Sequence, residues 1–300
     1  MTARPPPTDR SLDAHREFGV INLDKPPGPT SHQVVSWVKS ILGVEKAAHA
    51  GTLDPKVTGC LPILVGDATR MAQVFLAGKK EYVVVLDVHD DLPKNFEDVI
   101  REFIGDIYQK PPRKSAVSRQ LRTREIIAID ILERTDRAVL LRVRCEPGTY
   151  IRKLCHDIGL VLGVGAHMGE LRRTATEPFD DRDLVTLHEL TDAVAFAKDG
   201  DEKFLREILQ PAEAALTHLP AITIAETAVS TVAHGSPIYA PGIRTMPEFD
   251  EPPSLVACYS PDGSAVCLGK VVGDPTATSG KVIDLVRVLV DPVDAENQRS

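Results

Sequence analysis

The spacing of hydrophobic residues predicts alternating strands and helices in the first part of the chain. A short apolar stretch at residues 19–23 runs into a turn rich in proline and glycine, which is typical of a strand. Ser31 then stands where a helix N-cap is expected, and Gly43 closes the helical pattern that follows it. Further along, an apolar run at 60–65 is followed by a predicted helix at 67–78, a predicted strand at 79–89 and a predicted helix at 95–105.

In the later part of the chain the pattern of apolar residues changes. Two more strands are predicted at 124–133 and 137–146, the second with one apolar face and one mostly basic face. Helices are expected at 149–163, 186–198 and 201–209. From Leu219 onward, short apolar runs are separated by Gly and Pro, which indicates a small, mainly β domain.

The chain of 300 residues is long enough for two hydrophobic cores. Residues 1–17 are rich in proline and polar side chains, and we expect them to be poorly ordered. The predicted organisation is an α+β domain over 18–217, a smaller β domain over 218–293, and a tail over 294–300.

Charge is distributed unevenly. Residues 110–153 hold twelve Lys or Arg against five Asp or Glu, a net +7 in a chain whose overall charge is −8. Residues 106–122 show no periodicity and are predicted to form a long basic loop, and loops of that length in a compact domain are usually functional. Such a segment suits local phosphate binding, although composition alone equally fits a solvated basic face.

Several classes of protein are disfavoured. No apolar run approaches the roughly 20 residues of a membrane-spanning helix, and the N-terminus has no apolar signal region. Five dispersed cysteines without a Cys-x-x-Cys pair predict reduced thiols, a cytoplasmic location and no structural metal site.

The segment His49-Ala-Gly-Thr-Leu-Asp54-Pro-Lys-Val-Thr-Gly59 is the most informative in the sequence. By itself, an Asp before Pro is most often a turn residue. The whole segment, however, closely resembles the central motif of the TruB family of pseudouridine synthases. Four further segments resemble family motifs in the family's order: 22–31, Lys80-Glu-Tyr82, Gly148-Thr-Tyr-Ile-Arg152 and Glu170-Leu-Arg-Arg173. The C-terminal part, through residues 234–242, is similar to a PUA domain.

This resemblance implies a pseudouridine synthase fold with a mixed, largely antiparallel sheet, and an RNA-binding PUA domain. The implied reaction isomerises uridine to pseudouridine, is redox-neutral, and needs no metal or cofactor. Asp54 matches the catalytic aspartate and would act as the nucleophile. Whether it attacks C1′, adds to C6 or assists deprotonation of the sugar stays open at this point.

Arg152 is the second implied catalytic residue. A cation in the first turn of the predicted 149–163 helix interacts unfavourably with the helix dipole. A residue that violates a local preference in this way more often marks a functional site than a chance substitution. The family pattern pairs this arginine with the aspartate, and a nearby positive charge favours an ionised carboxylate. The alternative is an ordinary surface arginine.

The resemblance assigns other residues around the base. Tyr82 would stack on the flipped uracil, although its strand context also fits a half-buried sheet residue. Tyr150 and Leu171 would line the same pocket or simply pack in the core. Lys25 would support the active-site loops, and His49 would help to displace the base from RNA.

The basic loop resembles the family region that contacts the RNA backbone, which implies such contacts for Lys110, Arg113, Lys114, Arg119, Arg122 and Arg124. In one respect the chain departs from the family: Ala48 and Ala50 flank His49 where relatives usually have glycine, so the loop would be strained if either position needed φ > 0.

Residues 108–124 look like the archaeal and eukaryotic, dyskerin-like branch. That branch implies two modes, modification of uridine 55 in the T-loop of tRNA and guide-directed catalysis on rRNA in H/ACA particles with small archaeal partner proteins. The competing hypotheses are a catalytically silent RNA-binding scaffold, which would be favoured if Asp54, Tyr82 or Arg152 were replaced, and a carboxylate hydrolase, which would need a second acid in the Asp54 loop. None of the three is replaced, and no such acid is present.

Overall fold

The computed structural model describes residues 4–110, 120–274 and 277–292. Its first sheet has ten strands in the order β10-β1-β3-β8-β4-β7-β6-β5, with β2 added beside β3 and β9 beside β8. All of its pairs are antiparallel except β3 with β8. The strands are β1 (Phe18–Lys25), β2 (Ala47–His49), β3 (Thr58–Gly66), β4 (Lys80–Val88), β5 (Gly105–Gln109), β6 (Arg122–Arg134), β7 (Ala138–Cys145), β8 (Ala166–Thr176), β9 (Phe179–Asp180) and β10 (Gln210–Pro211).

A second sheet of six strands follows in the chain, in the order β12-β16-β15-β14-β11-β13. Its strands are β11 (Ala221–Ile224), β12 (Ile238–Tyr239), β13 (Ile243–Thr245), β14 (Val256–Tyr259), β15 (Ala265–Val271) and β16 (Lys281–Val288). The α-helices are α1 (Leu12–Glu17), α2 (Ser31–Leu42), α3 (Val74–Ala77), α4 (Phe96–Glu102), α5 (Ile151–Leu162), α6 (Leu187–Lys198), α7 (Lys203–Ile208) and α8 (Glu226–Ala233). The predicted α+β class with a mixed, largely antiparallel sheet is confirmed.

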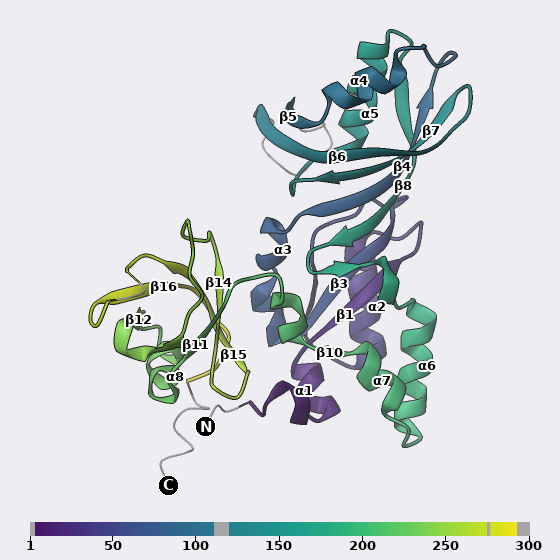
Figure 1. The fold of residues 1–300 in the computed structure, drawn as a ribbon. Helices are drawn as coiled ribbons and strands as arrows, with labels where there is room; N and C mark the ends of the chain where they lie inside the picture. Colours follow the sequence, from purple (N-terminus) through teal and green to yellow (C-terminus); the bar gives the residue numbers. More distant parts are fainter. Residues whose placement is uncertain (1–3, 111–119, 275–276, 293–300) are drawn as a thin grey trace.

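Two hydrophobic cores divide the first sheet into halves. One core lies between β1, β3 and the helices α2, α6 and α7, and the other between β4–β7 and the helices α4 and α5. Figure 1 shows the second half above the first, with β4 and β8 running between them. Tyr82 and Leu171 pack against both cores, so these two side chains lie at the seam.

The seam is narrow because β3 and β8 pair over only two positions, Thr58 with Arg172 and Gly59 with Arg173. Gly59 has φ +97°, and a Cβ there would lie 2.2 Å from the Arg173 carbonyl oxygen. Only glycine fits both the left-handed backbone and this close approach. The sequence therefore allows the two halves to meet at this position.

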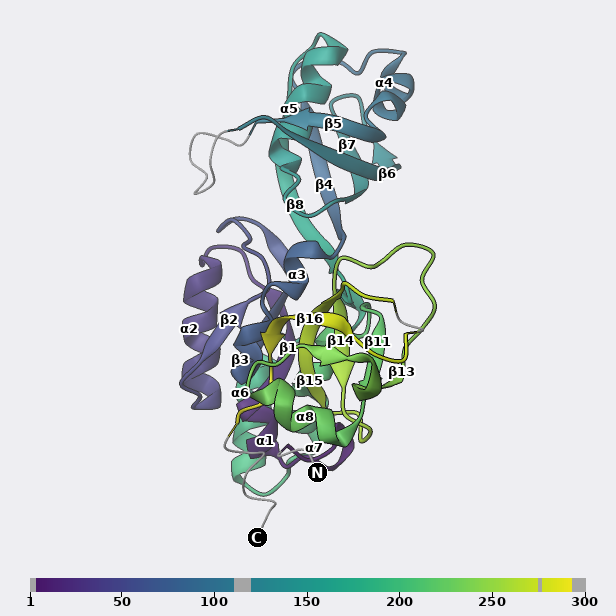
Figure 2. The same cartoon turned by 90° about the vertical axis from the view of Figure 1, so that its left-hand side faces the viewer.

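The second sheet packs against the first half through a continuous apolar core. Side chains such as Phe18, Leu64 and Phe75 share this core with Ala257 and Leu268 of the second sheet. In Figure 2 the second sheet and α8 lie at the level of the lower half, and the upper half stands above them. The site described below, between the two halves, is thus held by elements other than the second sheet.

The N-terminal segment differs from its prediction. Residues 1–17 were expected to be poorly ordered, but α1 packs through buried Leu12, and Arg10 is also buried. The Arg10 guanidinium makes two hydrogen bonds of 2.6 and 2.8 Å to Glu213, whose Oε1 also accepts the Ala265 amide at 3.0 Å. A buried arginine requires such a partner, and here the partner lies more than 200 residues away in the sequence.

Other local predictions also need correction. The expected helix over 67–78 is a 3-10 turn (Asp67–Met71) followed by the single turn of α3. The expected loop over 106–122 begins with strand β5, which pairs with β6. Thr30, not Ser31, is the N-cap of α2, because its hydroxyl accepts the Gln33 amide in a capping box. Helix α8 was not predicted.

Candidate active site

Asp54 lies in the loop between β2 and β3, and buried hydrogen bonds fix this loop. The Ser31 hydroxyl accepts the Leu53 amide at 2.9 Å and donates to the Leu53 carbonyl at 3.0 Å. The Val57 amide donates to the Asp54 carbonyl at 3.0 Å. Ala48 and Ala50 cause no strain, because all positive-φ residues that the structure describes are glycines. The backbone of Asp54 is therefore held on both sides.

Lys25, at the end of β1, holds the same loop through hydrogen bonds to its carbonyl groups. Its ammonium is fully buried and donates to the carbonyls of Pro26 at 2.9 Å, Pro55 at 3.0 Å and Val57 at 2.9 Å. Burial lowers the pKa of Lys25. The three carbonyls supply the hydrogen bonds that a buried ammonium requires, and two of them belong to the Asp54 loop.

The carboxylate of Asp54 and the guanidinium of Arg152 form an ion pair, in which Nη2 of the arginine donates to Oδ2 of the aspartate. Arg152 is the second residue of α5, so the pair joins the two halves of the first sheet. Both side chains are about half exposed, at 52% for Arg152 and 54% for Asp54. The carboxylate is thus oriented by a cation and still open to an incoming molecule.

Tyr82 and Leu171 lie at the seam, on β4 and β8, where both are partly buried. Burial raises the pKa of the Tyr82 phenol, and the charge and a hydrogen bond of Arg173 partly oppose this. The phenol therefore stays neutral near pH 7 and presents an aromatic surface.

Arg173 is a buried residue whose role was not predicted from the sequence. Its Nε donates to the Cys60 carbonyl at 2.7 Å and its Nη2 to the Gly51 carbonyl at 3.2 Å. It therefore links β8 to the Asp54 loop and to Tyr82. The neighbouring Arg172 makes a two-point contact with Asp24, at 3.0 and 3.1 Å.

Tyr150 is the N-cap residue of α5 and is partly buried. Its side chain makes no capping hydrogen bond, and its backbone is held instead by the side chain of Gln109. Gln109 is another residue that sequence reasoning missed. Like Asp24, Ser31, Arg172 and Arg173, it falls within a segment that resembles the family, here residues 108–124, but nothing in that segment singles out its side chain.

His49 lies at the end of β2, with its ring 5.0 Å from that of His32 in a T-shaped arrangement. Burial, followed by the nearby charges of His32 and Arg173, lowers the pKa of His49, so the imidazole is neutral at pH 7. Its buried Nδ1 has no hydrogen-bond partner among the described residues.

The residues predicted to contact the RNA backbone are only partly described. Lys110 is exposed at the end of β5 and Arg122 begins β6. Arg124 is partly buried, its Nη1 donates to the Thr123 carbonyl at 2.9 Å, and its guanidinium lies against Gly148. The remaining three, Arg113, Lys114 and Arg119, lie outside the described residues.

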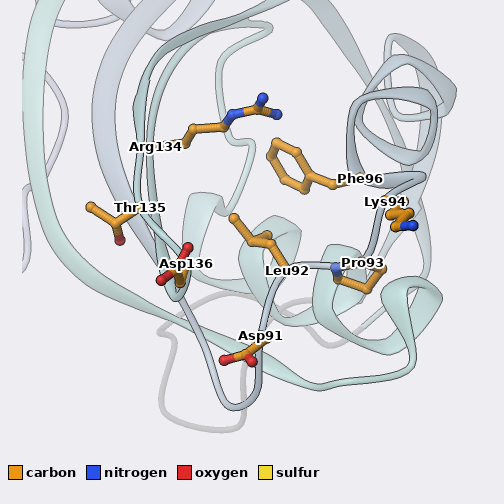
Figure 3. Close-up of a pocket in the computed structure, with 8 residues that line it drawn as sticks. All are labelled: Asp91, Leu92, Pro93, Lys94, Phe96, Arg134, Thr135 and Asp136. Atoms are coloured by element: carbon orange, nitrogen blue, oxygen red, sulfur yellow. The ribbon is translucent and has the colours of Figure 1, made fainter.

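A pocket of about 670 Å³ lies between the β4–α4 connection and the β6–β7 turn, and Figure 3 shows the side chains that line it. It is lined by Asp91, Leu92, Pro93, Lys94, Phe96, Arg134, Thr135 and Asp136. None of the candidate residues around Asp54 lines it. The ion pair, with its exposure and charge, therefore identifies the candidate site better than cavity size does.

Within residues 4–110, 120–274 and 277–292, no group of three or more His, Cys, Asp or Glu side chains could hold a metal ion. In the same ranges, every helix is too short or too polar to cross a membrane.

Three family models match the chain. They are the DKCLD (NUC011) domain over residues 5–35, the N-terminal domain of TruB family pseudouridylate synthases over 39–95, and the tRNA pseudouridylate synthase B C-terminal domain over 152–217. The DKCLD match includes α1, which agrees with the packing of Arg10 and Leu12 in the structure.

Curated relatives match over nearly the whole length. The “Probable tRNA pseudouridine synthase B” of Haloarcula marismortui is 60% identical, with 97% of this chain and 94% of that protein covered. The protein of the same name in Pyrococcus horikoshii is 53% identical, with 89% and 81% covered.

Solved structures agree. A crystal structure of a Cbf5–Nop10–Gar1 complex matches with a TM-score of 0.92 and 47% identity, over 96% of this chain and 90% of that chain. An H/ACA RNP bound to a substrate RNA containing 2′-deoxyuridine matches with a TM-score of 0.89 and 44% identity, over 97% and 90%. Since such relatives cover most of both lengths, the chain belongs to the TruB family and is a pseudouridine synthase of the archaeal, Cbf5-like type.

Proposed function

We propose that Asp54 is the catalytic carboxylate with which this chain converts uridine to pseudouridine in RNA. The observation that carries the proposal is the Asp54–Arg152 ion pair, formed between two halves of the sheet by residues 98 positions apart. The Arg152 guanidinium orients the carboxylate, and the half-exposed position of Asp54 leaves it within reach of a nucleoside. In the reaction the N1–C1′ bond breaks, the uracil turns, and a C5–C1′ bond forms, while C5 loses a proton and N1 gains one.

The surrounding residues receive roles that fit their positions. Tyr82 stacks on the uracil after it leaves the RNA helix, which replaces lost base stacking. Leu171 and Tyr150 form apolar walls beside it, and His49 occupies the space that the extruded nucleotide vacates. Lys25 holds the Asp54 loop and does not contact the substrate.

For substrates, we propose uridine 55 in the T-loop of tRNA and guide-directed uridines of rRNA. The first mode is supported by the names of the curated relatives. The second is supported by the match to Cbf5 in complex with Nop10 and Gar1 and to an H/ACA particle with substrate RNA. Partner proteins of this kind and a guide RNA are therefore proposed for this chain.

We also propose a division of labour along the chain. Residues 18–217 form the catalytic domain, and residues 218–293 form a PUA domain that binds RNA. Lys110, Arg122 and Arg124 lie in the basic segment 110–153 and are proposed to contact the RNA backbone, and RNA binding would weaken as the salt concentration rises.

The test is a single-turnover assay of pseudouridine formation in an unmodified tRNA transcript, run with the protein alone and with guide RNA and partner proteins. Asp54→Asn and Asp54→Ala are expected to abolish the reaction and leave RNA affinity within a few-fold. Asp192→Asn, an exposed aspartate on α6, is the matched control and should keep full activity.

Arg152→Ala should reduce the rate more than the affinity, because the arginine acts on the carboxylate. Near-wild-type rates for either Asp54 variant would refute the nucleophile assignment. Wild-type protein that binds RNA tightly but stays inactive in both arms would favour the scaffold hypothesis.

A further inference from the structure

Gln109 is a buried polar side chain at the end of an edge strand. It is the last residue of β5, is only 2% exposed, and lies opposite Arg122 of β6. Along β5, the partly buried Ile107 packs against the core beneath α5, and the alternation of a strand places Gln109 on that same face. The side chain therefore points towards the start of α5.

The oxygen and the nitrogen of the Gln109 side-chain amide both form hydrogen bonds with the backbone of one residue, Tyr150. The Tyr150 amide donates to Oε1 at 2.9 Å, and Nε2 donates to the Tyr150 carbonyl at 3.2 Å. The same carbonyl accepts the Lys153 and Leu154 amides at 3.0 Å each, as expected at the start of a helix. The Tyr150 side chain makes no capping bond, and Gln109 instead holds the backbone of this N-cap residue, as the N3 side chain of a capping box does.

Arg152 follows Tyr150 by two residues. Its ion pair with Asp54 is half exposed on both sides, and an exposed ion pair is a weak restraint on the position of a helix. Restraints on the start of α5 therefore come from buried contacts: the apolar side chains of Ile151 and Leu154, and the two hydrogen bonds of Gln109. Of these, only the Gln109 bonds fix the backbone of Tyr150 directly.

We propose that Gln109 is a positioning residue for the reaction: it sets where Tyr150 and Arg152 stand relative to Asp54 and does not contact the substrate. This inference rests on the proposed catalytic role of the Asp54–Arg152 pair. A displacement of about 1 Å in a catalytic group can cost on the order of 100-fold in rate. Loss of the two bonds should therefore slow the chemical step and leave RNA binding intact.

The test uses the full chain and unmodified tRNA under single-turnover conditions. Gln109→Met keeps the length and packing of the side chain but removes both bonds, and Gln109→Glu removes only the donor to the Tyr150 carbonyl. Both are expected to slow pseudouridine formation at least fivefold, with RNA affinity within twofold of wild type. Asp106→Asn, exposed on the same strand, is the matched control and should keep the wild-type rate.

A second measurement separates positioning from general structural damage. If Gln109 acts through Arg152, adding Gln109→Met to Arg152→Lys should change the rate less than threefold, because the shared step is already impaired. Full multiplication of the two effects would overturn the proposal. So would a Gln109→Met rate within fivefold of wild type, or a loss explained by weaker RNA binding.

The wild type and Asp54→Asn are measured alongside. An inactive wild type, or an active Asp54→Asn, would refute the proposed function itself. An active wild type, an inactive Asp54→Asn and an unaffected Gln109→Met would refute only the positioning role.

Discussion

Replacement of Lys25 by methionine tests whether the hydrogen bonds of the Lys25 ammonium hold the loop that carries Asp54. Methionine keeps most of the aliphatic packing and removes three hydrogen bonds of 2.9–3.0 Å from a buried ammonium. The Val57 carbonyl bond is buried, and an unsatisfied buried acceptor costs about 1–3 kcal/mol. The Pro26 and Pro55 carbonyls are partly buried and regain water, so each loses about 0.5–1 kcal/mol. The expected loss in the free energy of unfolding is about 2–5 kcal/mol.

The assay is urea unfolding followed by circular dichroism, combined with single-turnover pseudouridine formation. Lys46→Met is the matched control, because Lys46 is 61% exposed and its 3.2 Å ion pair with Asp67 should be worth at most about 1 kcal/mol. Lys25→Met should also reduce the rate more than the RNA affinity, since two of the three acceptors, Pro55 and Val57, belong to the Asp54 loop. Stability and rate both equal to those of the control would refute the reasoning.

Two further predictions concern the seam and a second buried lysine. Gly59→Ala adds a Cβ 2.2 Å from the Arg173 carbonyl at φ +97° and should cost at least about 3 kcal/mol in urea unfolding. Gly43→Ala, at φ +68° with no atom within 4 Å, should cost about 1 kcal/mol, and equal losses would contradict the close-contact argument. Burial lowers the pKa of Lys80 from 10.5 to about 8, so the folded chain releases this proton at a lower pH than the unfolded chain. Between pH 8 and pH 10.5 the free energy of unfolding of the wild type, relative to that of Lys80→Met, should therefore rise with pH by up to about 1.4 kcal/mol per pH unit. Unfolding measured over this pH range would exclude the titration if this difference in free energy stayed constant or fell.

The sequence determined most elements whose signals are local. Helix α2 is fixed by Thr30, Gln33 and Gly43, because a capping box and a left-handed glycine need only neighbours in the chain. Helix α5 and the valine-rich β4 follow in the same way from their periodicity. The predictions were wrong where contacts with residues distant in the sequence determine the local structure. The segment before α1 is held by the ion pair of Arg10 with Glu213, and β5 forms because it pairs with β6.

The residues of the candidate site likewise fall into two groups, those indicated by sequence motifs and those indicated only by the tertiary structure. The motifs of the sequence indicated Asp54, Arg152, Tyr82 and Lys25, because residue types in a fixed order are visible without coordinates. The resemblance already paired Arg152 with Asp54, and the structure shows this contact. Only the tertiary structure indicated a role for Gln109. A side chain that holds a distant backbone leaves no periodic or compositional trace, since its partner is chosen by the packing of two halves of a sheet and not by its neighbours in the chain.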